Sequence, residues 1–248
     1  MPALIFDCDG VLADTEKDGH LPAFNAAFEE FGLPIRWDDP TYNVKLTIGG
    51  GKERIASDLP DADPDLVKRL HLRKTELFTQ RVEEGLLPGR PGIRRIIEAV
   101  RSQGWTVAVA STSAERSVRA VLEHAVGPDL AGQCHVYAGD IVKAKKPAPD
   151  IYELVLSDLH LDPKDCLVVE DSGIGVRAAR GAGLTTIVTV SSYTADDDFT
   201  GAALVLDQLG DPGNPATVIA APAGVRPDGM VTVADLNALL ATNQEETR

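Results

Sequence analysis

The sequence predicts an α/β fold with a parallel-sheet, Rossmann-like core, helices on both faces of the sheet, and an α-helical domain inserted near the N-terminus. Three observations predict this fold. Short apolar runs alternate with helix-like segments after residue 92, a pattern typical of parallel sheets covered on both faces. A long segment before that point has helical spacing and lacks convincing strands. Several predicted strands end in polar residues, as at the ligand-binding edge of an open parallel sheet.

The N-terminal part predicts one strand followed by the inserted domain. Residues 3–6 are apolar and stop at an Asp-Cys-Asp-Gly sequence, which predicts a buried strand ending in a turn. From about 17 to 84 the chain is rich in Glu, Lys, Arg and Leu at helical spacing. A Pro- and Gly-rich stretch at 87–92 ends this segment. The predicted domains are therefore a helical insertion at 16–86 and a core formed by residues 1–15 and 87–248.

The remaining elements alternate along the core. Further strands are predicted at 106–110, 135–138, 166–169 and 186–190, with an edge strand at 203–206. Helices are predicted at 93–103, 114–124, 149–160, 174–182 and 232–241, the last beginning near a threonine cap. Residues 210–229 are rich in Pro and Gly and predict a loop.

Composition restricts the functional class. The 248-residue chain has a formal net charge of −14, which disfavours binding to nucleic acid and to anionic membrane surfaces. No run approaches the length of a transmembrane helix. Three scattered cysteines argue against a disulfide framework and fit a reducing compartment. We expect a cytoplasmic monomer, or a protein of the plastid stroma if a transit peptide was removed, whose anionic substrate needs a local positive site.

Polar residues follow the predicted strands where the strands end. They are Asp7 and Asp9 after the first strand, Ser111 and Thr112 after the second, and Glu170, Asp171 and Ser172 after a later one. The lysines Lys143, Lys145 and Lys146 follow the strand at 135–138. Because the carboxyl ends of parallel strands share one edge of the sheet, we expect these groups to face one crevice.

The carboxylates predict a metal site and a nucleophile. Two like charges about 4 Å apart cost about 4 kcal/mol at an effective dielectric near 20, and a bound cation relieves this repulsion. An all-oxygen ligand set favours a hard ion, and Mg²⁺ is the usual ion beside phosphate. A carboxylate such as Asp7 can attack phosphorus, and Asp9 can serve as general acid and then base. Taken alone, the Asp-rich turn could hold solvated acids, and Ser111 could cap a helix.

These residues, in this order, resemble the haloacid dehalogenase superfamily of phosphatases and phosphomutases. The resemblance covers nearly all of residues 1–190 and has four motifs: 7–12 with 14–16, Ser111, 146–150, and 170–172. It implies a nucleophilic Asp7, an acid/base Asp9, Ser111 holding the phosphoryl group and Lys146 orienting it. It also implies that Asp7, Asp171 and Glu170 bind Mg²⁺, helped by the carbonyl of Asp9.

The insertion resembles the helical cap that selects the substrate in this superfamily. Residues 49–55 together with 15–20 look like the CbbY-like branch, which includes xylulose-1,5-bisphosphate phosphatases. This resemblance implies a small phosphorylated sugar as substrate. Lys52 and Arg54 supply the local positive charge that an anionic substrate needs, and we expect them to bind a second phosphate. The alternative is that both are solvated charges at an exposed helix start. Further candidates for substrate binding are Glu16, His20, Tyr42, Arg81, Thr112 and Ser172.

Other functions compete with this hypothesis. Residues 173–178 fit a dinucleotide fingerprint, but Glu170 and Asp171 would repel a pyrophosphate, so a tight turn with close helix packing is the better interpretation. Residues 46–53 fail the phosphate-loop pattern, because position 46 is Leu and position 53 is Glu. A sugar phosphomutase of the β-phosphoglucomutase kind remains the alternative. In the mutase pattern a histidine lies five residues after the aspartate that matches Asp14, whereas His20 lies six after it, which favours a hydrolase. A binding protein that lost activity would lack Asp7 or Asp9.

Overall fold

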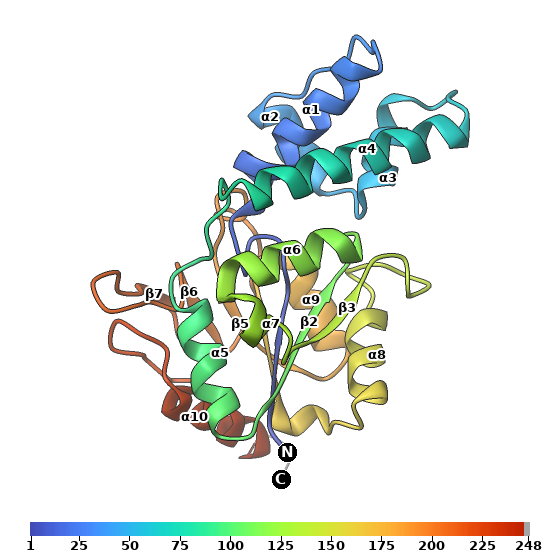
Figure 1. Ribbon diagram of the computed structural model, residues 1–248. Coiled ribbons are helices and arrows are strands. Elements are labelled where there is room, and N and C mark those ends of the chain that lie inside the picture. The colour runs from blue at the N-terminus through green and yellow to red at the C-terminus, as the bar shows by residue number, and fades with distance from the viewer. Residues whose placement is uncertain (246–248) are drawn as a thin grey trace.

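A seven-stranded sheet forms the centre of the protein in a computed structural model that describes residues 1–245 (Figure 1). Its order is β3-β2-β1-β4-β5-β6-β7, and every neighbouring pair is parallel except β6 and β7. The strands are β1 (Ala3–Phe6), β2 (Thr106–Ser111), β3 (His135–Ala138), β4 (Cys166–Glu170), β5 (Thr185–Thr189), β6 (Leu204–Leu206) and β7 (Val218–Ala220). The predicted mostly parallel α/β fold is confirmed.

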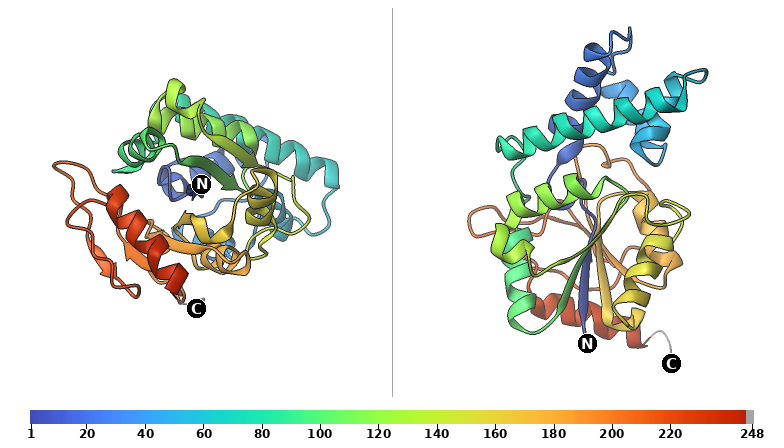
Figure 2. Two further views of the ribbon diagram at one scale, coloured as in Figure 1. Left: turned by 90° about the horizontal axis from the view of Figure 1, so that it is seen from below. Right: turned by 45° about the vertical axis from the view of Figure 1, so that its right-hand side comes forward.

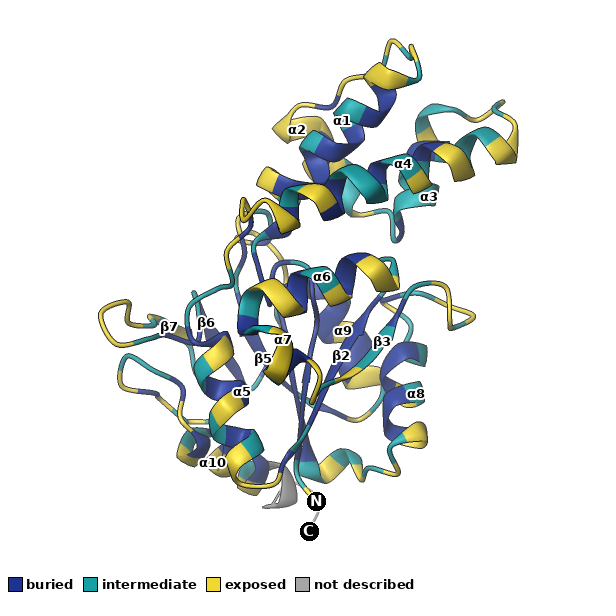
Figure 3. Ribbon diagram, viewed as in Figure 1, coloured by how far each residue is buried: buried dark blue, intermediate teal, exposed yellow. Residues whose placement is uncertain are grey.

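Helices cover both faces of the sheet because successive strand residues point to opposite sides. Leu4 and Phe6 pack with α5 (Ile93–Ser102), α6 (Glu115–Val126) and α10 (Val233–Glu245) on one face. Ala3 and Ile5 pack with α8 (Asp150–Asp158) and α9 (Gly173–Gly181) on the other. The central strands β1, β2, β4, β5 and β6 are mostly buried, whereas the edge strands β3 and β7 and the outer faces of the helices are partly exposed (Figure 3). Two short turns, α7 (Pro128–Ala131) and η2 (Pro163–Asp165), complete this part.

Every regular element of the predicted insertion is a helix or a helical turn. They are the π-helical turn η1 (Glu16–His20), α1 (Leu21–Glu30), α2 (Asp39–Leu46), α3 (Gly51–Asp58) and α4 (Pro64–Glu83). This helical segment (Glu16–Glu83) has its own core, built on Phe24, Phe28 and Trp37. Figure 2 shows the segment beyond one end of the sheet, with α10 and the N-terminus at the other end. The domain boundaries at 16–86 stay a prediction.

The region after β5 differs from the predicted one. Residues 210–229, predicted as a loop, contain β7, so the strand predicted at the edge, β6, lies inside the sheet. β7 has three residues and pairs antiparallel with β6. A strand this short carries no periodic pattern of its own, so it forms because β6 offers a backbone ladder. The predicted C-terminal helix is confirmed, and Thr232 accepts a hydrogen bond from the backbone N–H of Asp235 at its start.

Two global properties agree with the composition. Within the described chain no helix is both long and apolar enough to cross a bilayer. The cysteines Cys8, Cys134 and Cys166 are free thiols.

Candidate active site

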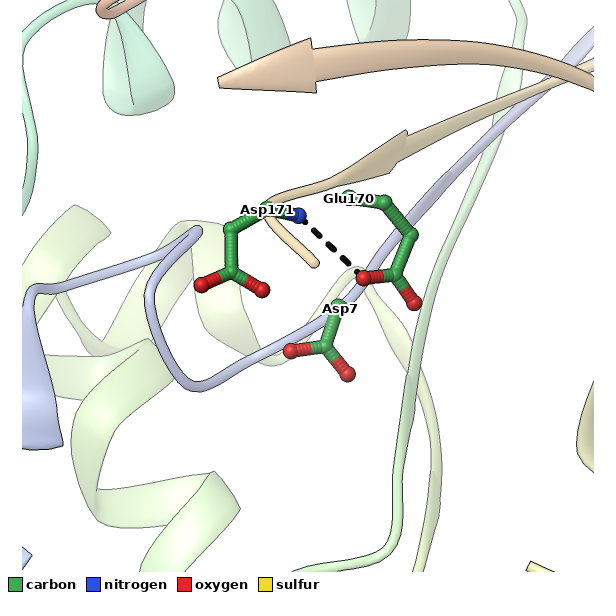
Figure 4. A group of neighbouring side chains, drawn as sticks. All are labelled: Asp7, Glu170 and Asp171. Carbon is green, nitrogen blue, oxygen red and sulfur yellow. Dashed lines mark hydrogen bonds between the residues drawn. The ribbon is translucent and has the colours of Figure 1, made fainter. Parts of the chain in front are cut away.

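Three buried carboxyl groups meet at the carboxyl edge of the sheet. Asp7 follows β1, Glu170 ends β4, and Asp171 comes next in the chain. The register of β1 against β4 pairs Phe6 with Val169, which places Asp7 beside Glu170. One carboxylate oxygen from each residue lies within 4.8 Å of the others (Figure 4). The structure therefore brings together three of the four acids whose convergence the sequence analysis expects, and the carboxylate of the fourth, Asp9, lies outside this group.

Lys146 links two of these acids. Its Nζ donates to Asp7 Oδ1 at 2.5 Å, to Glu170 Oε1 at 2.7 Å and to the carbonyl of Ala110 at 3.2 Å. Burial by itself lowers the pKa of the lysine, but the charges of Asp7 and Glu170 hold that pKa well above its usual value. Glu170 also accepts a hydrogen bond from the hydroxyl of Tyr152 at 2.6 Å. Lys146 is thus held as a cation against Asp7.

One lysine does not neutralise three buried acids. Burial, together with the nearby charges of Glu170 and Asp9, raises the pKa of Asp7 to about 8 despite the opposing charge of Lys146. Burial, with Glu170 and Asp7 nearby, also raises the pKa of Asp171 well above its usual value. The surplus negative charge and the all-oxygen donor set fit a hard divalent cation such as Mg²⁺.

Asp9 has a separate hydrogen-bond environment. Its Oδ1 accepts from the Thr15 hydroxyl at 2.6 Å and from His20 Nε2 at 2.9 Å, and its Oδ2 accepts from the Ser113 hydroxyl. Burial raises the pKa of Asp9, but these hydrogen bonds outweigh burial and hold the pKa below its usual value. The Asp9 carboxylate is not one of the three clustered acids. Its hydrogen bonds hold it in the ionised form.

Lys74, on α4, determines how His20 is protonated. Its Nζ lies 2.7 Å from His20 Nδ1. An ammonium group only donates, so Nδ1 accepts from it, and Nε2 carries the proton donated to Asp9. Burial lowers the pKa of Lys74 to about 8, although the charges of Glu16 and Asp9 oppose that shift. Lys74 and His20, both in the helical segment, thereby form a chain of hydrogen bonds to Asp9, the acid/base candidate.

The predicted hydroxyl residues lie at the same edge. Ser111 ends β2 and is buried, and its Oγ accepts from the backbone N–H of Ser113 at 3.1 Å. Ser111, Thr112 and Ser172 line one pocket together with Asp7 and Asp171 of the acidic cluster. The sequence analysis missed Ser113, Tyr152, Lys74 and Ser191, which donates to Asp171 at 2.7 Å. Ser113 could have been found because it lies two residues after Ser111, whereas the other three come close only through the fold.

The pocket lies between the core and the helical segment and has a volume of about 410 Å³. This volume is in the range of small-molecule sites. The helical segment contributes charged or titratable residues to its wall, namely Glu16, His20, Arg54, His71 and Lys74. Arg54 and Lys74 thus bring positive charge to a cavity that Asp7 and Asp171 also line, and this cavity is large enough for a small sugar phosphate.

Three predicted substrate residues are not among the residues that line the pocket. The hydroxyl of Tyr42 donates to Glu16 while its ring packs in the aromatic core of the segment. Lys52 forms an ion pair with Asp140 of the core, and Arg81 donates to the carbonyl of Asp18. On a helix, residues two apart point about 200° apart, so Lys52 and Arg54 cannot both face the pocket from α3.

The glycines after Asp171 have structural roles. A Cβ on Gly175 would lie 2.0 Å from the Glu170 carboxyl group, and a Cβ on Gly173 would lie 2.8 Å from the carbonyl oxygen of Asp198. These contacts account for the glycines by close packing, as the sequence analysis prefers over a dinucleotide site.

Known proteins resemble this chain along most of its length. A sequence model of the haloacid dehalogenase-like hydrolase family matches residues 1–183. A CBBY-like protein of Arabidopsis thaliana is 47% identical over 222 residues, covering 85% of this chain and 70% of that protein. Protein CbbY of Cupriavidus necator is 44% identical, covering 87% of this chain and 88% of that protein. A phosphorylated carbohydrates phosphatase of Thermotoga maritima is 35% identical, with 77% and 85% covered.

Solved structures agree with the sequence matches. The crystal structure of a mutant CbbY from Rhodobacter sphaeroides in complex with xylulose-(1,5)bisphosphate matches with a TM-score of 0.79 and 39% identity, covering 84% of this chain and 95% of that one. A putative β-phosphoglucomutase from Thermotoga maritima matches with a TM-score of 0.61 and 30% identity, covering 83% and 94%.

Proposed function

Because this chain belongs to the haloacid dehalogenase-like hydrolase family and is an enzyme of the phosphatase type, we propose that it is a Mg²⁺-dependent phosphatase that hydrolyses a small sugar phosphate. The observation that carries the proposal is the contact of Lys146 with Asp7. Asp7 lies beside Glu170 and Asp171 in space and two residues before Asp9 in the sequence. This arrangement offers a nucleophile, a cation for the phosphoryl oxygens and a separate acid/base group at one pocket.

Two steps complete the proposed reaction. A carboxylate oxygen of Asp7 attacks phosphorus, the bond to the sugar oxygen breaks, and Asp9 gives that oxygen a proton. Asp9 then takes a proton from water, whose oxygen attacks the phosphorus of the aspartyl-phosphate, so that phosphate leaves and Asp7 is restored. Ser111 and Lys146 hold the phosphoryl oxygens throughout, where their positive or donor groups stabilise the developing charge.

The two roles of Asp9 need two protonation states. Donation by His20, Ser113 and Thr15 favours the carboxylate, the form required to activate water. An anionic phosphate bound nearby raises the pKa of a carboxyl group by charge repulsion, which favours the acid form required for the first step. Substrate binding would therefore supply the change in proton affinity that the acid role needs.

Asp7, Asp171 and Glu170, with the carbonyl of Asp9, would hold the magnesium ion. When bound, the ion neutralises charge on the phosphoryl oxygens and on the surrounding carboxylates. This assignment is supported by the surplus negative charge of the buried cluster.

The proposed substrate carries a second phosphate, and xylulose-1,5-bisphosphate is the candidate that the CbbY complex suggests. Arg54 would bind the second phosphate, since it lines the pocket and its Nε is fixed by the carbonyl of Ile48 at 3.0 Å. Glu16 lies 3.8 Å from Arg54 and partly balances its charge. Glu16, His20, Thr112 and Ser172 would contact the sugar and its phosphates from the pocket wall.

A substrate panel with Mg²⁺ tests this function. We expect phosphate release from sugar phosphates, fastest with a ketopentose bisphosphate. Arg54→Gln should lower kcat/KM for a bisphosphate about tenfold more than for a monophosphate, because it removes a charged hydrogen bond to the second phosphate. Arg81→Gln, outside the pocket, is the matched control and should change neither value.

Two outcomes would contradict the proposal. Interconversion of hexose phosphates without release of inorganic phosphate would identify a mutase. An equal loss for mono- and bisphosphates in Arg54→Gln would remove Arg54 from the second-phosphate site.

A further inference from the structure

Four charged side chains connect the helical segment to the core beside the pocket. From α3, Lys52 pairs with Asp140, and Glu53 accepts from Lys145 Nζ at 2.9 Å. Asp140 and Lys145, both in the stretch that follows β3, also pair with each other, with Nζ and Oδ1 3.1 Å apart. Each side of the contact therefore contributes one lysine and one acid, and we call these four residues the α3 charge cluster.

The chain approaches closely at this contact because of glycines. Gly50 has a φ of +99°, and a Cβ there would lie 2.6 Å from Lys145 Nζ and 2.1 Å from Glu53 Oε2. A Cβ on Gly49 would lie 3.3 Å from the carbonyl oxygen of Lys146. The glycine loop before α3 therefore rests directly on the backbone that carries the catalytic lysine.

Adjacent lysines point to the two sides of this contact. Lys145 reaches outward to Glu53 and Asp140, whereas Lys146 reaches inward to Asp7 and Glu170. Any movement that separates α3 from Lys145 acts on the peptide unit next to Lys146. Lys145, which contacts the helical segment, and Lys146, which contacts Asp7, are thus consecutive residues.

We propose that Lys52, Glu53, Asp140 and Lys145 are positioning residues that close the helical segment over the pocket and thereby hold Lys146 against Asp7. The proposal rests on the proposed phosphatase function. The side chains of the cluster are between 21% and 54% exposed, so single pairs are screened by water and salt, and the effect depends on the set acting together. Lys52 then acts through Asp140 and not through the substrate.

Charge exchange within each half tests the cluster without changing the net charge. The variant K52E/E53K inverts the α3 half, D140K/K145E inverts the core half, and the four-residue variant inverts both. We expect each half exchange to lower kcat/KM about tenfold, and the full exchange to restore it to within about threefold, because like charges face each other only in the half exchanges. A matched control is R94E/E98R, which exchanges an exposed pair on α5 and should leave kcat/KM unchanged.

A second variant separates this role from direct phosphate binding by Lys52. Asp140→Asn should lower kcat/KM by the same factor, about two- to threefold, for mono- and bisphosphates, because it weakens closure for both. If Lys52 instead bound the second phosphate, removing its carboxylate partner would raise kcat/KM for the bisphosphate. That result, or a full exchange no better than the worse half exchange, would overturn the proposal.

Small-angle scattering of the substrate-free protein provides a readout that does not depend on turnover. We expect both half exchanges to increase the radius of gyration and the full exchange to return it to the wild-type value. Should the wild type hydrolyse no sugar phosphate, the proposed function fails while scattering still tests the contact. Half exchanges with an unchanged radius of gyration would contradict the contact itself.

Discussion

Asp7 and Lys146 show how the fold makes one carboxyl group reactive. Asp7 is buried, and burial alone would favour its protonated, non-nucleophilic form. The ammonium group of Lys146, 2.5 Å away, opposes that effect, and a bound divalent ion would add to it. The nucleophile is therefore ionised only when its neighbours are in place, which links activity to the geometry of this pair.

Replacing Asp7 tests the nucleophile directly. We expect Asp7→Asn to fold but to lower phosphate release below about 1% of wild type, since the amide cannot form the covalent intermediate. Urea unfolding would establish that the variant is folded, and Asp129→Asn, an exposed residue of α7, is the control. Hydrolysis well above that level would remove Asp7 from the nucleophilic role.

At the scale of elements, α9 and β4 are packed more closely than ordinary side chains allow. The helix begins at Gly173, two residues after Asp171, and Gly175 contacts the Glu170 carboxyl group. Glu170 can remain buried and bonded to Lys146 because this position of α9 has no side chain. The absence of a side chain at Gly175 thereby leaves room for the Glu170 carboxyl group in the acidic cluster.

A methyl group at this contact should disturb the site more than the helix. We expect Gly175→Ala to cost about 1–3 kcal/mol of unfolding free energy by overpacking and to lower kcat by displacing Glu170. Gly181→Ala, at the end of the same helix, is the matched control, because its Cβ would lie no closer than 3.2 Å to Pro149. Unchanged kcat in Gly175→Ala would show that Glu170 needs no fixed position.

For the whole molecule, the acidic cluster joins separate parts of the chain. β1 and β4 are 160 residues apart in sequence but adjacent in the sheet, and the pocket above them is closed by the helical segment. A divalent ion bound between Asp7 and Asp171 would relieve their repulsion in the folded state only.

Chelation should therefore lower both activity and stability. We expect excess EDTA to stop phosphate release and lower the Tm, and Mg²⁺ to restore both; a ligand at one hundred times its Kd stabilises a fold by about 2.7 kcal/mol. In Asp171→Asn the Tm should respond little to Mg²⁺. Full activity in excess EDTA would contradict the proposed metal dependence.

The sequence alone determined the six parallel strands, the alternation of helices and the residues at the strand ends, because those features depend on local periodicity and on short motifs. Asp7, Glu170 and Asp171 could be placed together from sequence since parallel strands share a carboxyl edge. The tertiary structure alone decided that Lys74 reaches His20, that Tyr152 and Ser191 support the acids, and that Lys52 pairs with Asp140 instead of lining the pocket. These contacts join residues far apart in the chain, and their side-chain directions depend on how the helical segment lies on the core, which no local pattern encodes.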